Sequence, residues 1–235
     1  MNLIQASGTF VTKGTTESGV NCIKLVIPVQ NSDAKPAPVY LIPTRAAGEN
    51  FMGMSIVPDN FEEGTQILFT GRLYPNKEEQ RMYIAPTLPL QIVHKDLVMN
   101  NVTIAGGVGY IAEERRTDLF SCGILCNAPK QKLLKHDWED NVGFKLEAWG
   151  DDATRLRKHA FKGRQMVACG TLRYDTWEGP NGTNAAYKVR TRAGHYQFFG
   201  KNKEKAQSIQ LQQTPPVAKT AEVTPTAPEP DNIPF

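Results

Sequence analysis

Short runs in which apolar and polar residues alternate dominate the chain up to residue 200, and this period predicts strands rather than helices. In the first half the apolar runs lie at Leu3, Val11, Cys22 and residues 24–26, 39–41 and 67–69. In the second half they lie at residues 102–104, 120–125, 144–149, 165–172 and 187–191. Residues 151–161 carry the one clear helical pattern, because carboxylates open it and Gly163 follows it. Five strands with one helix between the third and fourth predict a small closed Greek-key barrel.

The pattern occurs twice. Residues 1–10 resemble residues 99–108 at an offset of 98, and residues 64–73 resemble residues 163–172 at an offset of 99. Both ends of the unit keep their spacing, so the halves are predicted to be copies of one domain with different loop lengths. We therefore expect an all-β chain with two tandem barrels, at residues 1–95 and 96–202, each near the usual domain size.

Beyond residue 202 the composition shifts to Gln, Thr, Ala and Pro. Such a segment buries too little apolar surface to offset its ordering entropy, so residues 203–235 are predicted to be a disordered linker. Its last five residues are Asp231, Asn232, Ile233, Pro234 and Phe235. They place two bulky apolar groups at the end of a polar tether, which predicts a partner-binding tip.

Composition argues against several classes of protein. The chain is 40% hydrophobic and 22% charged, as is usual for a globular protein, and no apolar run approaches the ~18 residues that a membrane span needs. No signal-peptide pattern opens it, so a cytoplasmic location is expected. The four cysteines include no Cys-x-x-Cys pair, so neither a disulfide framework nor a zinc ribbon is indicated. Cys122 and Cys126, with His136 nearby, are the weak alternative of a metal site; no metal or cofactor is expected.

Charge is unevenly distributed along the chain. Residues 1–95 hold 8 basic and 8 acidic residues, residues 96–202 hold 16 and 12, and residues 203–235 hold 3 and 4. The surplus of +4 (16 minus 12) lies in the second half. A polyanion is therefore expected to bind that half first.

The second half resembles the bacterial single-stranded-DNA-binding protein family over most of residues 99–200. The motifs that carry the resemblance are Asn100-Asn101-Val102-x-Ile104-x-Gly106, Ala148-Trp149-Gly150, Lys162-Gly163-Arg164 and Gly170-x-Leu172-Arg173…Trp177. The final residues also resemble that family's Asp-Asp-Ile-Pro-Phe tip. The resemblance implies OB-folds and binding of single-stranded DNA without sequence preference, in replication, recombination and repair. It further implies that the tip docks on replication and repair proteins, that the location is nucleoid-associated, and that two-domain chains form homodimers with four OB-folds.

Carried over from the family, Trp149 and Trp177 occupy positions where aromatic rings stack on bases. Trp177 is expected in a loop, because turn residues follow it at 179–182. The family's stacking position six residues before Trp149 holds Gly143 here. In the first half, Thr44 or a neighbour lies near the place of Trp149, and Glu78 lies near that of Trp177. Whether residues 1–95 contact DNA or mainly form the dimer is therefore open.

Binding any single strand requires a basic groove for phosphates and flat rings for bases. Side chains alternate along a strand, so the basic and aromatic residues of three second-half strands are expected on one side, opposite the apolar set. A Pro-bearing stretch between two of the strands adds lysines and a tryptophan that could extend the groove. The predicted DNA-binding residues are Lys130, Lys132, Lys135, Trp138, Lys145, Trp149, Arg173, Trp177, Lys188, Arg190 and Arg192.

The sequence leaves two alternatives to DNA binding, an enzyme and an adaptor. An enzyme would have to use Asp151, Asp152 and His159, but these residues also open and close the predicted helix, so no catalysis is expected. The second alternative is a protein-docking adaptor with weak or no DNA binding. The neutral first half fits an adaptor, whereas the basic and aromatic second half favours DNA. The cations of the helix, Arg155, Arg157 and Lys158, are expected to form a solvated face.

Overall fold

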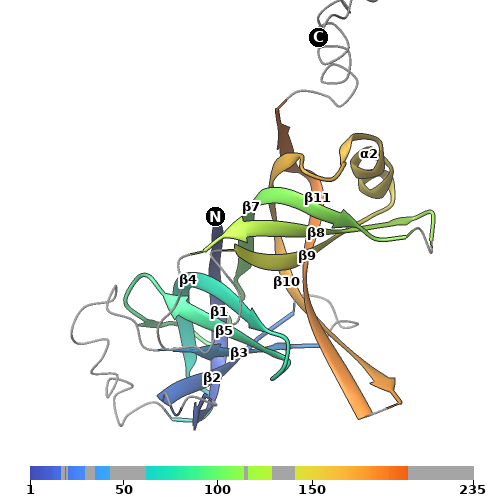
Figure 1. The fold of residues 1–235 in the computed structure, drawn as a ribbon. Coiled ribbons are helices and arrows are strands. Elements are labelled where there is room, and N and C mark those ends of the chain that lie inside the picture. The colour runs from blue at the N-terminus through green and yellow to red at the C-terminus, as the bar shows by residue number, and fades with distance from the viewer. Residues whose placement is uncertain are drawn as a thin grey trace, which may run out of the picture. The chain divides into compact units, whose positions relative to one another are not determined.

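The computed structural model describes residues 1–16, 19, 21–29, 35–42, 62–113, 116–128, 141–180 and 182–200 (Figure 1). These residues are almost entirely strands, as the alternating pattern predicts. Among them, no helix is long and apolar enough to cross a membrane. All the strands join in one eleven-stranded sheet.

The first half closes into a five-stranded barrel. Its strands are β1 (Asn2–Thr15), β2 (Asn21–Ile27), β3 (Ala37–Leu41), β4 (Gln66–Asn76) and β5 (Arg81–Pro86). β1 pairs with β2 and β2 with β3, both antiparallel, and β3 pairs with β5 in parallel. β5 then pairs with β4 and β4 returns to β1, which closes the ring. The short β6 (Gln91–Ile92) adds to β4.

The second half repeats this ring. Its strands are β7 (Asn100–Ile111), β8 (Leu119–Asn127), β9 (Asn141–Trp149), β10 (Gln165–Gly179) and β11 (Gly182–Phe199), with helix α2 (Asp151–His159) between β9 and β10. The order β7, β8, β9, β11, β10 returns to β7, and only the β9–β11 pair is parallel. Both halves are therefore OB-fold barrels, which confirms the predicted fold class.

The strand register confirms the internal repeat. Ile4 pairs with Gly71 in the first barrel, and Val102 pairs with Gly170 in the second, which are the offsets of 98 and 99 read from the sequence. β1 and β7 also pair with each other, antiparallel, so the two barrels share a continuous sheet.

The first-strand bulge is repeated too, between Phe10 and Thr12 and again between Val108 and Tyr110. An asparagine near the start of β1, and another near the start of β7, donates its side-chain amide to a backbone oxygen. The two acceptors lie at equivalent positions of β4 and β10. Asn2 Nδ2 lies 3.0 Å from the Leu73 oxygen, and Asn100 Nδ2 lies 2.9 Å from the Leu172 oxygen.

The lengths of the last two strands were not predicted. β10 has 15 residues and β11 has 18, so they run as a long two-stranded ribbon well beyond the closed part of the barrel (Figure 1). Trp177, expected in a loop, lies within β10 and pairs with Asn184. The predicted helix is real but ends at His159, because Ala160 already has an extended backbone.

Candidate nucleic-acid interface

Three adjacent strands, β9, β11 and β10, present basic side chains in register on one face. Lys145 of β9 pairs with Lys188 of β11, which pairs with Arg173 of β10. In the next row Glu147 pairs with Arg190. The side chains that alternate with them are buried in the barrel: Phe144, Leu146, Ala148, Leu172 and Val189. The faces inferred from alternation are therefore confirmed, and the strand pairing brings them together on one surface.

Glu147 lies on this face but is not exposed. Its side chain is 3% accessible, beneath Lys188 at 2.9 Å, Lys145 at 3.4 Å and Arg190 at 4.0 Å. A buried carboxylate requires such partners, because the desolvation of an unpaired charge is costly. Glu147 thus neutralises part of the positive charge that side-chain alternation alone would leave available to a ligand.

Lys188 is the least available of the basic residues. Its side chain is 16% accessible and it contacts Asp175 at 2.6 Å in addition to Glu147. Burial opposes its charge, but the two carboxylates outweigh burial and raise the pKa of Lys188. It therefore holds the strands together more than it offers a contact to a phosphate.

The three arginines of the face are differently placed. Within the described part of the chain, Arg173 and Arg192 have no ion pair, and Arg190 reaches only Glu147. Nε and Nη1 of Arg173 and Nε of Arg190 are buried without a hydrogen-bond partner there. Burial, and then the nearby guanidinium groups of Arg190 and Arg192, lower the pKa of Arg173. An anion in contact with these side chains would relieve the repulsion between their guanidinium groups.

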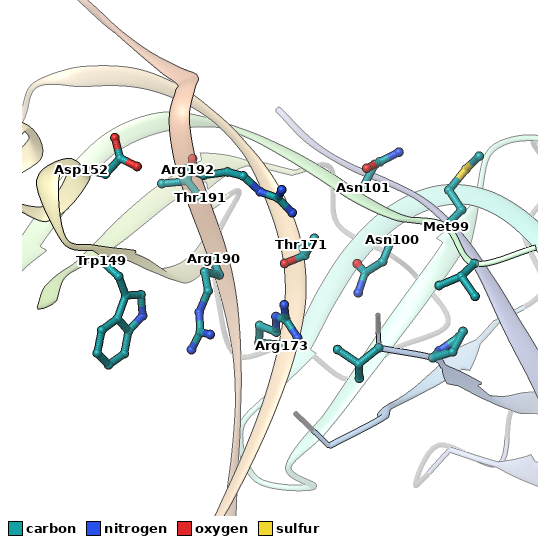
Figure 2. A pocket seen from close by; sticks show the side chains of 13 residues that line it. Met99, Asn100, Asn101, Trp149, Asp152, Thr171, Arg173, Arg190, Thr191 and Arg192 are labelled. Atoms are coloured by element: carbon teal, nitrogen blue, oxygen red, sulfur yellow. The ribbon is translucent and has the colours of Figure 1, made fainter. Parts of the chain in front are cut away.

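These arginines line a groove of about 610 Å³, which Figure 2 shows from close by. Trp149 stands at one end of it, and Asn101 and Thr171 add polar groups to its wall. The three arginines and one carboxylate, Asp152, that line the groove leave it a charge of +2 (3 minus 1). The groove is thus a polar, positively charged channel with an aromatic ring at its edge.

Trp149 ends β9 with 36% of its surface accessible. The guanidinium carbon of Arg116 lies 5.1 Å from the centre of its ring, and that of Arg190 lies 5.4 Å away. Both distances suit a cation–π contact, which holds a ring in place at the surface. The ring is therefore oriented and partly open to solvent, as a stacking surface requires.

Trp177 lies on the same side of β10 as Arg173 and Asp175 and is 50% accessible. Its partner Asn184 is six residues along β11 from Arg190, or about 20 Å at ~3.3 Å per residue. The two tryptophans therefore lie too far apart to hold the same base.

The first barrel carries different chemistry at the equivalent positions. The strand register aligns a buried row of the first barrel with one of the second: Leu41, Ile84 and Leu73 with Leu146, Val189 and Leu172. The equivalent outward-facing residues follow from this alignment. Lys145, Lys188 and Arg173 correspond to Tyr40, Tyr83 and Tyr74, while Glu147 and Arg190 correspond to Ile42 and Ala85. The first barrel therefore lacks the charged rows at these positions.

The β10–β11 ribbon instead packs on this part of the first barrel. Tyr187 donates its hydroxyl to the Pro38 oxygen at 2.6 Å, and its ring centre lies 5.0 Å from that of Tyr174. Lys35 forms a bridge with Tyr174 and donates to the hydroxyl of Thr176. The inner side of the ribbon is thus attached to the first barrel, while its outer side bears Trp177.

Several residues considered for other chemistry have structural roles. Arg157 donates to the backbone oxygens of Thr117 and Leu119, each at 3.1 Å, so it fixes a turn rather than lying on a solvated face. Cys122 and Cys126 are buried thiols. Among the described residues no group of three or more His, Cys, Asp or Glu side chains could hold a metal ion.

Some predicted residues lie outside the described ranges. They are Lys130, Lys132, Lys135 and Trp138, and the tip residues Asp231, Asn232, Ile233, Pro234 and Phe235. Tyr110 is not among the predicted residues, although its exposed ring lies on the same barrel. The sequence pattern indicates Tyr110 only weakly, because the bulge that turns its ring outward shifts the alternation of apolar and polar residues by one position.

Comparison with protein-family models and with curated proteins finds no match. Among solved structures, a deletion mutant of the single-stranded DNA binding protein from Thermus aquaticus superimposes with a TM-score of 0.56 at 15% identity, covering 86% of this chain and 96% of that one. This chain shares its fold. The wild-type Thermus aquaticus protein gives a TM-score of 0.53 at 15% identity, over 86% and 94%. Since 86% exceeds the length of either barrel, the likeness to these single-stranded DNA binding proteins extends over both.

Proposed function

We propose that this chain binds single-stranded DNA without sequence preference and catalyses no reaction. The observation that carries the proposal is the face of β9, β11 and β10. There Arg173 and Arg192 have no ion pair among the described residues, and Arg190 lies 5.4 Å from the ring centre of Trp149. Phosphates and base faces are common to every strand, so this surface reads no sequence. The shared fold with the Thermus aquaticus proteins, which are named for this activity, agrees with it.

The arginines and the tryptophans of the interface have different roles. Arg173, Arg190 and Arg192 bind phosphates, and Trp149 stacks on a base. Trp177, carried about 20 Å further along the ribbon, stacks on another base of the same strand. Lys145 and the undescribed loop lysines Lys130, Lys132 and Lys135, with Trp138, extend the contact.

Salt dependence measures the phosphate contacts. Release of counterions from a single strand gives a slope of log K against log salt of about −0.7 per phosphate, so three arginines predict about −2 per chain. Each substitution Arg173→Gln, Arg190→Gln or Arg192→Gln should reduce the slope by about 0.7. Lys95→Gln, an exposed cation between the barrels, is the matched control and should leave the slope unchanged.

The remaining parts have separate roles in the proposal. The first barrel supports the ribbon, and two chains form a homodimer with four OB-folds. The tip Asp231-Asn232-Ile233-Pro234-Phe235 recruits replication, recombination and repair proteins in the cytoplasm. It does so with two apolar side chains and a carboxylate at the end of a tether.

The deciding experiment is tryptophan fluorescence during titration with oligo-dT, at low and high salt, with matching duplex as competitor. Quenching that survives the duplex is expected, and Trp149→Ala should weaken binding roughly 5- to 150-fold, since one base stack contributes about 1–3 kcal/mol. The aromatic control is Phe199→Ala. Phe199 is exposed and ends β11, far from Asn184, the residue of β11 that pairs with Trp177. Absence of both quenching and an anisotropy change would remove DNA as the ligand and favour the protein-docking adaptor.

A further inference from the structure

Tyr110, near the end of β7, holds an open aromatic ring on the outer surface of the second barrel. Its side chain is 53% accessible and it pairs across the strands with Gly123 of β8. A Cβ placed on Gly123 would lie 2.1 Å from Cε1 and 2.4 Å from Cδ1 of the Tyr110 ring. The ring therefore lies across the glycine, supported by the strand below and open to solvent above.

A β-bulge directs the ring outward. Val108 is buried and pairs with Ile124, so strict alternation would turn Tyr110 into the core as well. The register shifts between Val108 and Tyr110, and the extra residue, Gly109, places Tyr110 on the outer face opposite Gly123. Bulges of this kind re-aim side chains next to functional sites.

The first barrel has the same bulge without this arrangement. There Thr12 follows the bulge in the place of Tyr110 and pairs with Lys24 in the place of Gly123. The ring and the glycine that makes room for it thus occur together only in the barrel that bears the basic face. A purely structural cover for the backbone would be equally useful in both copies.

The Tyr110 ring continues the candidate interface. Gly123 pairs with Lys145, which pairs with Lys188, which pairs with Arg173, so Tyr110 stands at the far end of one row across five strands. Between Tyr110 and Trp149, the outer positions of β8 are Gly123 and Ser121, which carry no side chain and a small one. This part of the sheet is therefore low enough for a flat base to lie against it.

We infer that Tyr110 is a third base-stacking surface, which extends the path of the single strand from β9 over β8 to β7. The inference rests on the proposed function, because a base can reach Tyr110 only if the strand follows the Lys145 row. Tyr110 accepts any nucleobase, because stacking uses the face of the ring and no base-specific hydrogen bond. Tyr110 is thus the aromatic contact on the side of the face away from Trp177.

The test compares three substitutions in the full-length chain. Tyr110→Leu keeps an apolar cover over Gly123 but removes the ring, and it should weaken oligo-dT binding at least about five-fold, the lower end for one base stack. Tyr110→Phe keeps the ring and should bind like the original chain. Ile92→Ala, an exposed isoleucine on β6 of the first barrel, is the matched control and should have no effect.

Photocrosslinking of the unsubstituted chain to an oligonucleotide containing 5-iodouracil gives a second readout that folding defects do not affect. Crosslinks to the peptide that contains Tyr110 are expected, besides those to Trp149. Wild-type affinity in Tyr110→Leu together with no crosslink there would overturn the inference. If Trp149→Ala still weakens binding in that case, the proposed function stands; if Trp149→Ala has no effect either, both fail.

Discussion

At the scale of single residues, Glu147 decides how much positive charge the candidate interface has left for a ligand. It lies buried between Lys145, Lys188 and Arg190, within 4.0 Å of each. Glu147→Gln leaves these cations without their common partner, and because they are partly exposed we expect a loss of only about 1–3 kcal/mol in the free energy of unfolding. Urea unfolding measures this loss.

The same substitution should strengthen DNA binding at low salt, since the face gains one positive charge. Glu62→Gln, an exposed carboxylate on the first barrel, changes the net charge equally and is the control. Weaker binding by Glu147→Gln at low salt, with an intact fold, would show that Glu147 positions the arginines rather than neutralising them.

Buried thiols make the second barrel sensitive to alkali. Burial raises the pKa of Cys122 to about 12 and that of Cys126 to about 11, from 9.0. The unfolded chain loses these protons near pH 9 while the folded chain keeps them. Their contribution to stability is therefore complete below pH 9 and falls by up to about 1.4 kcal/mol per thiol for each pH unit above it. Urea unfolding at pH 8 and pH 10 should show a smaller difference in Cys122→Ala; equal differences would contradict this origin.

At the scale of elements, the β10–β11 ribbon joins the two barrels through its inner side. Tyr187→Phe removes the hydroxyl that donates to the Pro38 oxygen, so a partly buried carbonyl loses this hydrogen bond at a cost of about 1–2 kcal/mol. The melting temperature should fall by roughly 2–8 °C. Calorimetry measures this, with Tyr110→Phe, whose ring is exposed, as the control. No change in melting temperature would mean that the ribbon does not depend on this contact.

The sequence predicted the five strands of the second barrel and four of the first, but it missed β5 and the reach of this ribbon. Alternation continues through residues 173–177, yet nothing local marks where a strand leaves the barrel and joins another surface. The glycines and proline at residues 179–182 suggested an early loop, and this placed Trp177 in it. Contact with Pro38 and Lys35, 149 and 141 residues away from their partners Tyr187 and Thr176, instead supports the extended ribbon.

At the scale of the whole molecule, two copies of one fold differ in surface chemistry, and the tip should act independently of both. Deletion of Phe235 is expected to leave oligo-dT binding unchanged, whereas Trp177→Ala should weaken it at least a few-fold. Anisotropy titration measures both variants under the same salt. Equal losses in the two variants would contradict this division between binding and recruitment.

Side-chain alternation and turn residues act locally, so the sequence alone was enough to predict the all-β class, the repeat, the helix that follows β9 and the faces of β9, β10 and β11. The neighbours of each residue came from the tertiary structure: the rows across three strands, the burial of Glu147, the ring of Tyr110 on Gly123 and the tyrosines that replace the charged rows in the first barrel. These depend on register and on contacts between residues far apart in the chain. Alternation assigns a side chain to a face, but strand pairing decides which neighbours it meets there.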